Sequence, residues 1–464
     1  MKRWFTMWRS WGVVLLLSSF SLPSFALNFG KMRADEVAVY VKDLNTGKMV
    51  AEHRTDVAMN PASTMKLVTA FAAFRALGAQ YRWQTEFKSD GKIVGDTLQG
   101  DIYWVGSGDP VFDQESLIAM QQQLRSAGIQ RITGQLVLDR SVWGDKGSAD
   151  DFVEDTGATF MTAPDPHMLA YKVVWAKPER DATGAIVVRT NPPLPEIPQR
   201  QALTLSASGA ACPSLARYMQ ASYQGGVLSF TGQLPSSCLG QEMFINMLNT
   251  QEFAQRSFIN QWRAMGGQIS DGIRISTTPT DAKVLARFQS KPMWEILSDM
   301  NKFSNNLIAR TVFLKLGEQA ADKRTSQNAK IAVRREWVAA GLDDETLILE
   351  NGSGLSRRER ITARHLGQML EKVYYSPFRQ AFIDGLPIAG TDGTLKTRFR
   401  QIGAPLRLKT GTLKNVRALA GYWLGDGNTP PLVIVVLINS SRSDQYLADM
   451  DHLVAHVVRG ARAF

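Results

Sequence analysis

The sequence predicts an α/β fold that is interrupted by a large insertion, part of which is β-rich. A hairpin pattern followed by a helical pattern opens the chain after residue 36, and strand patterns return at 418–423 and 432–438. Between about 142 and 235, prolines cluster and short alternating runs dominate. Because 464 residues exceed one ordinary domain, we expect two or three domains with substantial cores.

The first 26 residues have the pattern of a cleavable export signal. A basic start precedes an apolar run at 12–17, and Ser-Phe-Ala at 24–26 is a small-x-small cleavage site. The alternative, an uncleaved membrane anchor, is weakened because the apolar core is short and broken by serines and a proline. We expect the mature chain to begin at Leu27. The basic residues of the leader are Lys2, Arg3 and Arg9.

The mature chain opens with a hairpin and a helix. Residues 36–42 alternate as a strand, Asn-Thr-Gly at 45–47 makes a turn, and 48–51 return as a second strand. The run from 61 to 77 then carries apolar residues at helical spacing, and Gly78 is a suitable helix stop. This order is typical of the start of an α/β sandwich.

Further elements follow along the chain. The apolar run at 432–438 is continuous and therefore belongs in the middle of a sheet. A closing helix at 444–463 is expected to cover that sheet, with membrane docking as the alternative. The other expected helices are 114–128, 252–265, 293–316 and 361–370; the other expected strands are 97–99, 102–104, 134–139, 185–189, 227–230, 272–275, 406–409 and 418–423.

Ser63 and Lys66 are a candidate nucleophile and base. Three residues apart on a helix, the two side chains share one face. A serine hydroxyl is a poor nucleophile until a base takes its proton, and lysine can do so only when it is neutral. Neutrality near pH 7 requires lowering the lysine pKa by about three units, through burial or a nearby cation. Alone, Ser-x-x-Lys also occurs by chance at helix starts.

Two later motifs strengthen the catalytic interpretation. Ser-Asn-Asn at 304–306 and Lys-Thr-Gly at 409–411 follow Ser-x-x-Lys in the order found in active-site-serine penicillin-binding proteins and β-lactamases. If the motifs converge, repulsion from Lys409 should keep Lys66 neutral. Asn306 can then hydrogen-bond Lys66, and Ser304 can relay a proton toward the leaving amine as general acid.

The third motif is expected to bind substrate. Lys409, kept charged, would attract a substrate carboxylate with help from the hydroxyls of Thr410 and Thr412, while Gly411 lets the substrate backbone lie against the strand. The backbone N–H groups of Ser63 and Thr412 would hold the oxyanion, and losing one such donor costs about 3 kcal/mol. The predicted reaction is acyl transfer through an acyl-Ser63 enzyme.

The cysteines agree with export, and the charge suits an anionic partner. Cys212 and Cys238 are the only cysteines of the sequence, and they predict a disulfide, with two buried free thiols as the alternative. The formal charge is +10, of which three units lie in the leader, and it suits an anionic polymer or membrane surface. The sequence has no basic run with interleaved aromatic residues, so we expect no nucleic-acid partner.

No metal or cofactor is expected. His452 and His456 lie four residues apart, but the sequence offers no further ligand at metal spacing, so they predict a solvated helix face. The sequence also lacks the zinc-peptidase, nucleotide-binding and Gly-x-Ser-x-Gly motifs.

With these motifs the chain resembles the class C low-molecular-mass penicillin-binding proteins of the penicillin-binding protein 4 type, the S13 peptidase family. The resemblance also covers the segments 351–357, 386–390 and 392–394. It implies a transpeptidase-like domain of the penicillin-binding protein and serine β-lactamase fold, with an antiparallel sheet flanked by helices and a helical subdomain. A large inserted α/β and β-rich region would interrupt this domain. The resemblance also implies a periplasmic D-alanyl-D-alanine carboxypeptidase, endopeptidase or both, acting on peptidoglycan stem peptides and cross-links and acylated by β-lactams.

The resemblance also implies a domain division. Relatives with a compact form of this fold have a much shorter interval between the first two motifs, so we expect a catalytic domain at 27–89 and 277–464 and an inserted domain II at 90–141 and 237–276. A β-rich domain III at 142–236 would be nested inside it. Asp155 is the candidate to meet the charged end of a diaminopimelate side chain, with a solvated loop aspartate as the alternative.

Two other functions remain open. A β-lactamase-like hydrolase would share the acylation step, but the sequence has no Glu-x-x-x-Asn pattern after Ser304. A non-catalytic wall-binding or β-lactam-sensing protein would not label at Ser63. A homodimer and a weak peripheral membrane association are also left open.

Overall fold

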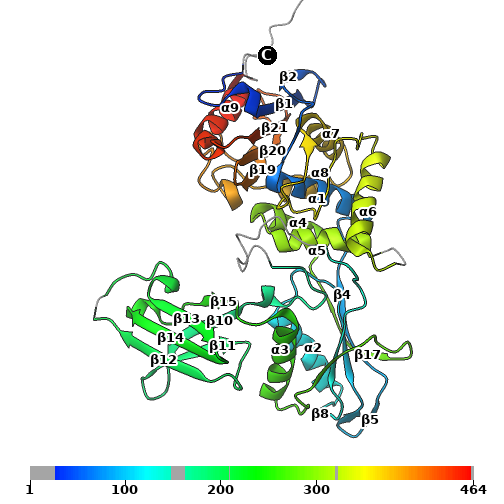
Figure 1. The fold of residues 1–464 in the computed structure, drawn as a ribbon, viewed down its shortest axis with the longest axis vertical. Helices are drawn as coiled ribbons and strands as arrows, with labels where there is room; N and C mark the ends of the chain where they lie inside the picture. The colour runs from blue at the N-terminus through cyan, green and yellow to red at the C-terminus, as the bar shows by residue number, and fades with distance from the viewer. Residues whose placement is uncertain (1–26, 148–161, 208, 319–321, 461–464) are drawn as a thin grey trace, which may run out of the picture.

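The structure is a computed structural model that describes residues 27–147, 162–207, 209–318 and 322–460. The expected leader and Asp155 lie outside the described residues. The chain folds into two lobes along one long axis, with both ends of the described chain in the upper lobe (Figure 1). The upper lobe is built from residues at both ends of the sequence, as the colours of Figure 1 show, and the lower lobe from the interval between them.

The upper lobe is organised around one antiparallel sheet in the order β19-β20-β21-β1-β2. Its middle strand, β21, is buried except for its last residue. Successive side chains of a strand point to opposite faces, and here both faces are covered, so the continuous apolar run is explained. The strands are β1 (Val37–Asp43), β2 (Met49–His53), β19 (Leu406–Leu413), β20 (Val416–Trp423) and β21 (Leu432–Asn439).

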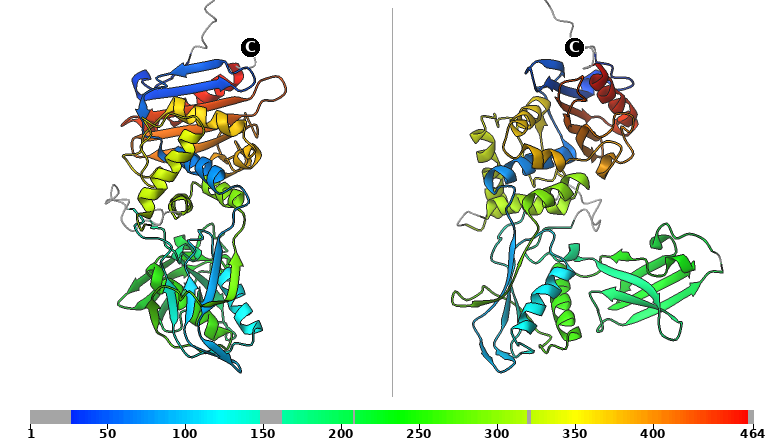
Figure 2. Two further views of the ribbon diagram at one scale, coloured as in Figure 1. Left: turned by 90° about the vertical axis from the view of Figure 1, so that its right-hand side faces the viewer. Right: turned by 180° about the vertical axis from the view of Figure 1, so that it is seen from behind.

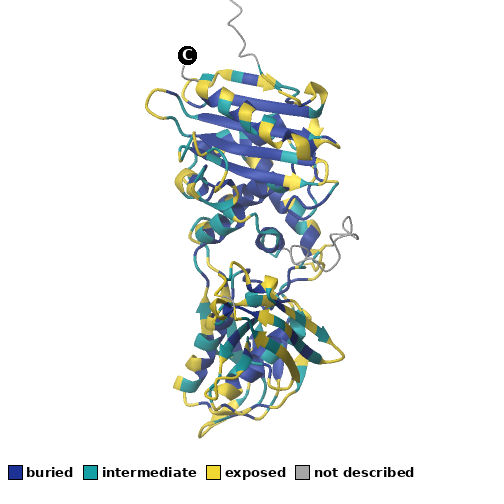
Figure 3. Cartoon of the chain, turned by 90° about the vertical axis from the view of Figure 1, so that its left-hand side faces the viewer, coloured by how far each residue is buried: buried dark blue, intermediate teal, exposed yellow. Residues whose placement is uncertain are grey.

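Helices cover both faces of this sheet. The closing helix α9 (Leu447–Gly460) packs on one face, as expected, in a core that includes Val454 and Ile434. On the other face, α1 (Met65–Ala76) and α7 (Ala363–Tyr374) share a core with Val435 and the remaining helices of the lobe. Figure 3 shows the sheet as a nearly continuous buried layer.

The helices below the sheet form a helical subdomain that carries the second motif. The expected helix at 293–316 is divided in two, because the chain between them turns through a left-handed residue, Ser304, at φ 54°. The helices are α4 (Met293–Lys302), α5 (Asn306–Gly317), α6 (Thr325–Ala339) and α8 (Arg379–Asp384); a short ladder joins β3 (Ala58–Met59) and β18 (Ile361–Thr362).

The lower lobe contains a second, mixed sheet in the order β16-β9-β7-β4-β17. Helices α2 (Gln114–Ser126) and α3 (Thr250–Ala264) pack against it (Figure 2). The sheet begins at Gln84 and ends at Gln289, so it extends beyond the expected boundaries at 90 and 276. Its strands are β4 (Gln84–Ser89), β7 (Ile102–Val105), β9 (Leu136–Asp139), β16 (Ile273–Ile275) and β17 (Lys283–Gln289); β5 (Lys92–Val94), β6 (Thr97–Gln99) and β8 (Arg131–Ile132) form a small sheet beside it.

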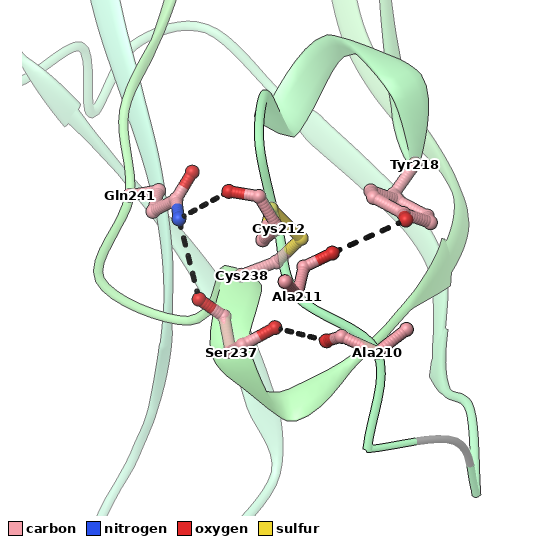
Figure 4. Close-up of a disulfide and its surroundings, with 7 residues drawn as sticks. All are labelled: Ala210, Ala211, Cys212, Tyr218, Ser237, Cys238 and Gln241. Atoms are coloured by element: carbon pink, nitrogen blue, oxygen red, sulfur yellow. Dashed lines mark hydrogen bonds between the residues drawn. A yellow bond between two sulfur atoms is a disulfide. The ribbon is translucent and has the colours of Figure 1, made fainter.

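A β-rich module projects from the lower lobe, on the left in Figure 1. It has two three-stranded sheets, β11-β10-β15 and β12-β14-β13, and ends at Ile245, later than the expected residue 236. The expected disulfide between Cys212 and Cys238 is present there (Figure 4). The strands are β10 (Val174–Arg180), β11 (Ile186–Asn191), β12 (Gln199–Leu205), β13 (Met219–Gln224), β14 (Val227–Leu234) and β15 (Met243–Ile245).

Two further findings concern the described part of the chain alone. None of its helices combines the length and the apolar character that crossing a bilayer requires. Its His, Cys, Asp and Glu side chains form no group of three or more that could hold a metal ion.

Candidate active site

Ser63 lies in a tight turn that leads directly into a helix. The turn is the 3-10 helix η2 (Ala62–Thr64), which continues into α1. Asn60 Oδ1 accepts a hydrogen bond from the Ala62 N–H at 2.8 Å, and the Thr64 hydroxyl donates to the Pro61 carbonyl at 2.7 Å. These two contacts hold the turn, and Ser63 itself remains half-buried.

Lys66 is completely buried beside Ser63. Its Nζ lies 3.0 Å from Ser63 Oγ, 2.6 Å from Asn306 Oδ1 and 2.5 Å from the carbonyl oxygen of Ser353. The amide oxygen and the carbonyl oxygen can only accept hydrogen bonds. A neutral amine therefore donates its two protons to them and leaves its lone pair for the hydroxyl of Ser63.

The turn at 351–354 belongs to a segment that carries the family resemblance, and the sequence alone predicts no role for its residues. It packs directly on the Ser63 turn. Gly354 has φ +80°, and a Cβ added there would lie 1.9 Å from the Ala62 carbonyl oxygen. Only glycine fits such an approach in a left-handed conformation. The turn brings the Ser353 carbonyl to Lys66, and its Gly352 carbonyl accepts from Thr69 Oγ1 at 2.7 Å.

The second motif enters between α4 and α5. Asn305 caps α5 by accepting from the Ile308 N–H at 3.0 Å, so the next residue, Asn306, begins the helix and faces Lys66. Ser304 Oγ accepts a hydrogen bond from Lys409 Nζ at 2.9 Å. The second motif thus contacts both of the other motifs.

The third motif lies on β19, the strand at the sheet edge. A Cβ on Gly411 would lie 2.8 Å from the Pro61 carbonyl oxygen, so this glycine permits the strand to approach the Ser63 turn. Thr410 Oγ1 donates to Thr394 Oγ1 at 2.8 Å, and the Thr412 side chain is exposed. Thr394 belongs to another segment of the resemblance, 392–394, for which the sequence alone predicts no role.

The protonation of the two lysines has a different main cause from the one expected. Burial lowers the pKa of Lys66 to about 7, and the charge of Glu359 opposes that shift. Burial also holds the pKa of Lys409 well below its usual range, and there the charge of Lys66 adds to the effect. The expectation that Lys409 is kept charged is therefore not met by its buried environment in the free protein. Desolvation, and not repulsion from Lys409, is therefore what lowers the pKa of Lys66.

Glu359 is a buried residue of the site that the sequence analysis does not identify. Its carboxyl is fully buried, and burial raises its pKa to about 7 against the opposing effects of backbone hydrogen bonds and Lys66. In the sequence it stands among arginines, in Arg357-Arg358-Glu359-Arg360. Such a run predicts a solvated surface, so no local signal marks it as buried.

A small cavity adjoins the second motif. It has a volume of about 270 Å³ and lies between Ser304, Asn306 and residues of the lower lobe, Tyr171 and Asn246 among them. Phe303 at its rim is 70% exposed. The lower lobe therefore reaches the edge of the candidate site, whereas the Cys212–Cys238 disulfide lies in the projecting module.

The chain is similar to known proteins over most of its length. The sequence model of the D-Ala-D-Ala carboxypeptidase 3 (S13) family matches residues 20–457. The D-alanyl-D-alanine carboxypeptidase DacB of Haemophilus influenzae is 28% identical over 428 residues, 89% of this chain and 88% of that protein. A D-alanyl-D-alanine carboxypeptidase of an Actinomadura species is 28% identical over 405 residues, 83% of this chain and 74% of that protein.

A solved structure supports the fold. The crystal structure of penicillin binding protein 4 from Haemophilus influenzae, complexed with a β-lactam, matches with a TM-score of 0.67 and 25% identity. The match covers 90% of this chain and 95% of that one.

Proposed function

The chain belongs to the D-Ala-D-Ala carboxypeptidase 3 (S13) family, and from that premise we propose that it cleaves peptidoglycan stem peptides by acyl transfer through Ser63. The family makes it a serine-type D-alanyl-D-alanine carboxypeptidase. The observation that carries the mechanism is the buried amine of Lys66, 3.0 Å from Ser63 Oγ, with two acceptors for its own protons.

Acylation begins when Lys66 accepts the hydroxyl proton of Ser63 while Oγ attacks the carbonyl carbon of the penultimate D-alanine. The backbone N–H groups of Ser63 and Thr412 are proposed to stabilise the oxyanion. The proton then passes from Lys66 to the leaving amine through Ser304, the C–N bond breaks, and the terminal D-alanine departs. Water attacks the acyl-Ser63 ester and regenerates the serine.

Lys409 is proposed to recognise the carboxylate of the leaving group, together with Thr410 and Thr412. Burial disfavours the protonated, charged form of Lys409. A bound substrate carboxylate would stabilise that charged form by forming an ion pair with the amine. Charge on Lys409 would thus accompany substrate binding. Thr394, which accepts from Thr410, would orient that hydroxyl.

The same chemistry serves a cross-link, where the leaving amine belongs to a diaminopimelate residue, so endopeptidase activity is part of the proposal. Asp155 stays a prediction for contact with that side chain. We further propose that residues 1–26 are a cleaved leader and that the enzyme works in the periplasm. For the domains we propose boundaries near 83 and 290, because β4 and β17 belong to the lower sheet.

Labelled penicillin tests this proposal. The wild-type protein should form a covalent adduct on the peptide that contains Ser63, release it slowly, and liberate D-alanine from a peptide ending in D-Ala-D-Ala. Ser63→Ala should do neither. Rapid penicillin turnover would favour a β-lactamase-like hydrolase, and absence of any adduct would favour a non-catalytic wall-binding protein.

A further inference from the structure

A buried carboxyl lies behind the proposed base. Glu359 has no exposed surface, and its Oε1 accepts from the backbone N–H groups of Glu350, Asn351 and Gly352 at 3.2 to 3.3 Å. Its Oε2 has no hydrogen-bond partner in the described part of the chain. Successive backbone N–H groups that converge in this way form a site for an anion.

The same turn holds the proposed base. Ser353 directly follows the three residues whose N–H groups donate to Glu359. Its carbonyl oxygen accepts a hydrogen bond from Lys66 Nζ at 2.5 Å. Asn351 Oδ1 accepts from both the N–H and the hydroxyl of Ser353, at 3.1 and 2.6 Å. The turn is therefore fixed on one side by Glu359 and on the other by helix α1, through Lys66 and Thr69.

We propose that Glu359 is a positioning residue for acylation: it holds the turn that offers the Ser353 carbonyl to Lys66, and its charge controls how readily Lys66 loses a proton. This inference rests on the proposed function. The positioning role follows from geometry alone. The Ser353 carbonyl accepts a hydrogen bond from one of the two N–H groups of the neutral amine, and this directs the lone pair of Lys66 toward Ser63.

The effect of the Glu359 charge on the protonation of Lys66 follows from electrostatics. The pKa of Lys66 and the pKa of Glu359 are each about 7, and each charge stabilises the other, so the two groups titrate together. Other charged groups nearby have their own partners: Lys409 donates to Ser304, Glu350 pairs with Lys330 and Arg358, and Arg360 donates to the Arg357 and Glu359 carbonyls.

The sign of the effect follows. An ionised Glu359 favours the charged form of Lys66, which cannot act as a base. Glu359→Gln removes that charge but keeps an oxygen that can accept from the turn. Lys66 should then become neutral at a lower pH, and the acid limb of acylation should move down by about one pH unit.

The test is the acylation rate with labelled penicillin, measured from pH 5 to pH 9 on the full chain. Glu359→Gln should lower the midpoint of the acid limb. Glu359→Asp keeps the charge but is too short to reach the turn, so its midpoint should stay near that of the wild type while the plateau rate falls about tenfold. Glu371→Gln is the matched control, because that carboxylate pairs with Lys42 in the same lobe, and it should change neither value.

A purely structural Glu359 would lower the rate of Glu359→Gln at every pH without moving the midpoint, and that result would overturn the inference. If Glu359→Gln does not fold, a Glu359→Asp variant with wild-type midpoint and wild-type plateau would overturn it as well. A wild-type protein that forms no adduct on Ser63 would instead contradict the proposed function, on which the inference rests.

Discussion

Among the described residues, Lys66 Nζ has three hydrogen-bond partners, and one of them is the proposed nucleophile. Spacing along the sequence was enough to pair Ser63 with Lys66, and the motif Ser-x-Asn was enough to suggest Asn306 as a partner. The Ser353 carbonyl could not be predicted in this way, because any residue has a carbonyl and only the fold decides where it points. Glu359 could not be predicted either, because it stands among arginines in the sequence, and such a charged run predicts an exposed segment and not a buried carboxyl.

Gly354→Ala tests the packing of the 351–354 turn on the Ser63 turn. A methyl group at this position would clash with the Ala62 carbonyl and would also strain a left-handed backbone. The Ser353 carbonyl should move away from Lys66, and the acylation rate should fall about 100-fold. Gly403→Ala is the control for backbone strain alone, because that glycine has φ +81° and no atom within 4 Å of an added Cβ. Equal acylation rates in the two variants would contradict the prediction.

Lys409→Gln tests carboxylate recognition. The variant should lose about 10- to 100-fold in kcat/KM on a peptide with a free C-terminal carboxylate, since a hydrogen bond between charged groups is worth about 1.5 to 3 kcal/mol. On the same peptide with a C-terminal amide it should lose much less. Steady-state assays of the wild type and the variant on both peptides measure these losses of kcat/KM. An equal loss on the two peptides would show that Lys409 does not bind the carboxylate.

At the scale of elements, the sequence placed most helices and strands close to where they lie. The strand at 432–438 and the helix at 361–370 follow from their apolar patterns, and the structure adds that the Thr362 hydroxyl caps this helix, α7. The break at 303–305 did not follow from such a pattern, because the apolar pattern continues through it and the left-handed Ser304 is held by tertiary contacts, among them the hydrogen bond from Lys409. Periodicity therefore predicted one helix, whereas the structure has two, α4 and α5, with the second motif at the break between them.

Asn305→Ala tests whether the cap of α5 positions the second motif. Removing an N-cap costs about 1 kcal/mol of stability, and here it should also lower the acylation rate, since Asn306 is the first residue of the capped helix. Thr362→Ala removes the cap of α7, which accepts from the His365 N–H at 3.0 Å, and is the matched control. Both variants should unfold more easily in a thermal melt. Acylation should fall in Asn305→Ala alone, and a parallel fall in both would contradict the prediction.

At the scale of the whole molecule, the chain leaves the upper lobe after the Ser63 helix and returns to it before the second motif. The long interval between the first two motifs predicted an insertion, and the proline-rich texture predicted a nested module. Boundaries were harder to predict, because β4 and β17 have ordinary strand patterns and only their pairing shows which sheet they join. The cysteine pair agrees with the expected export, but nothing in the sequence indicates where the module lies relative to the site.

The disulfide tests how independent the projecting module is. The Cys212–Cys238 bond closes a loop with a sequence separation of 26, so replacing both cysteines by serine should destabilise the module by roughly 3 kcal/mol. The motif cluster lies in the other lobe, so acylation by penicillin should keep its wild-type rate. Thermal unfolding followed in parallel with acylation checks both points, and a large loss of acylation below the unfolding transition would contradict them.

The account as a whole depends on one buried amine that is neutral near physiological pH. The most direct measurement is an NMR titration of the Lys66 side chain, in protein labelled with ¹³C at the lysine Cε position and assigned by comparison with Lys66→Arg. The account predicts that the Lys66 resonance titrates with a midpoint near pH 7, where burial places its pKa. A midpoint near the ordinary value of about 10.4 would contradict the account, because Lys66 would then be charged whenever the enzyme works.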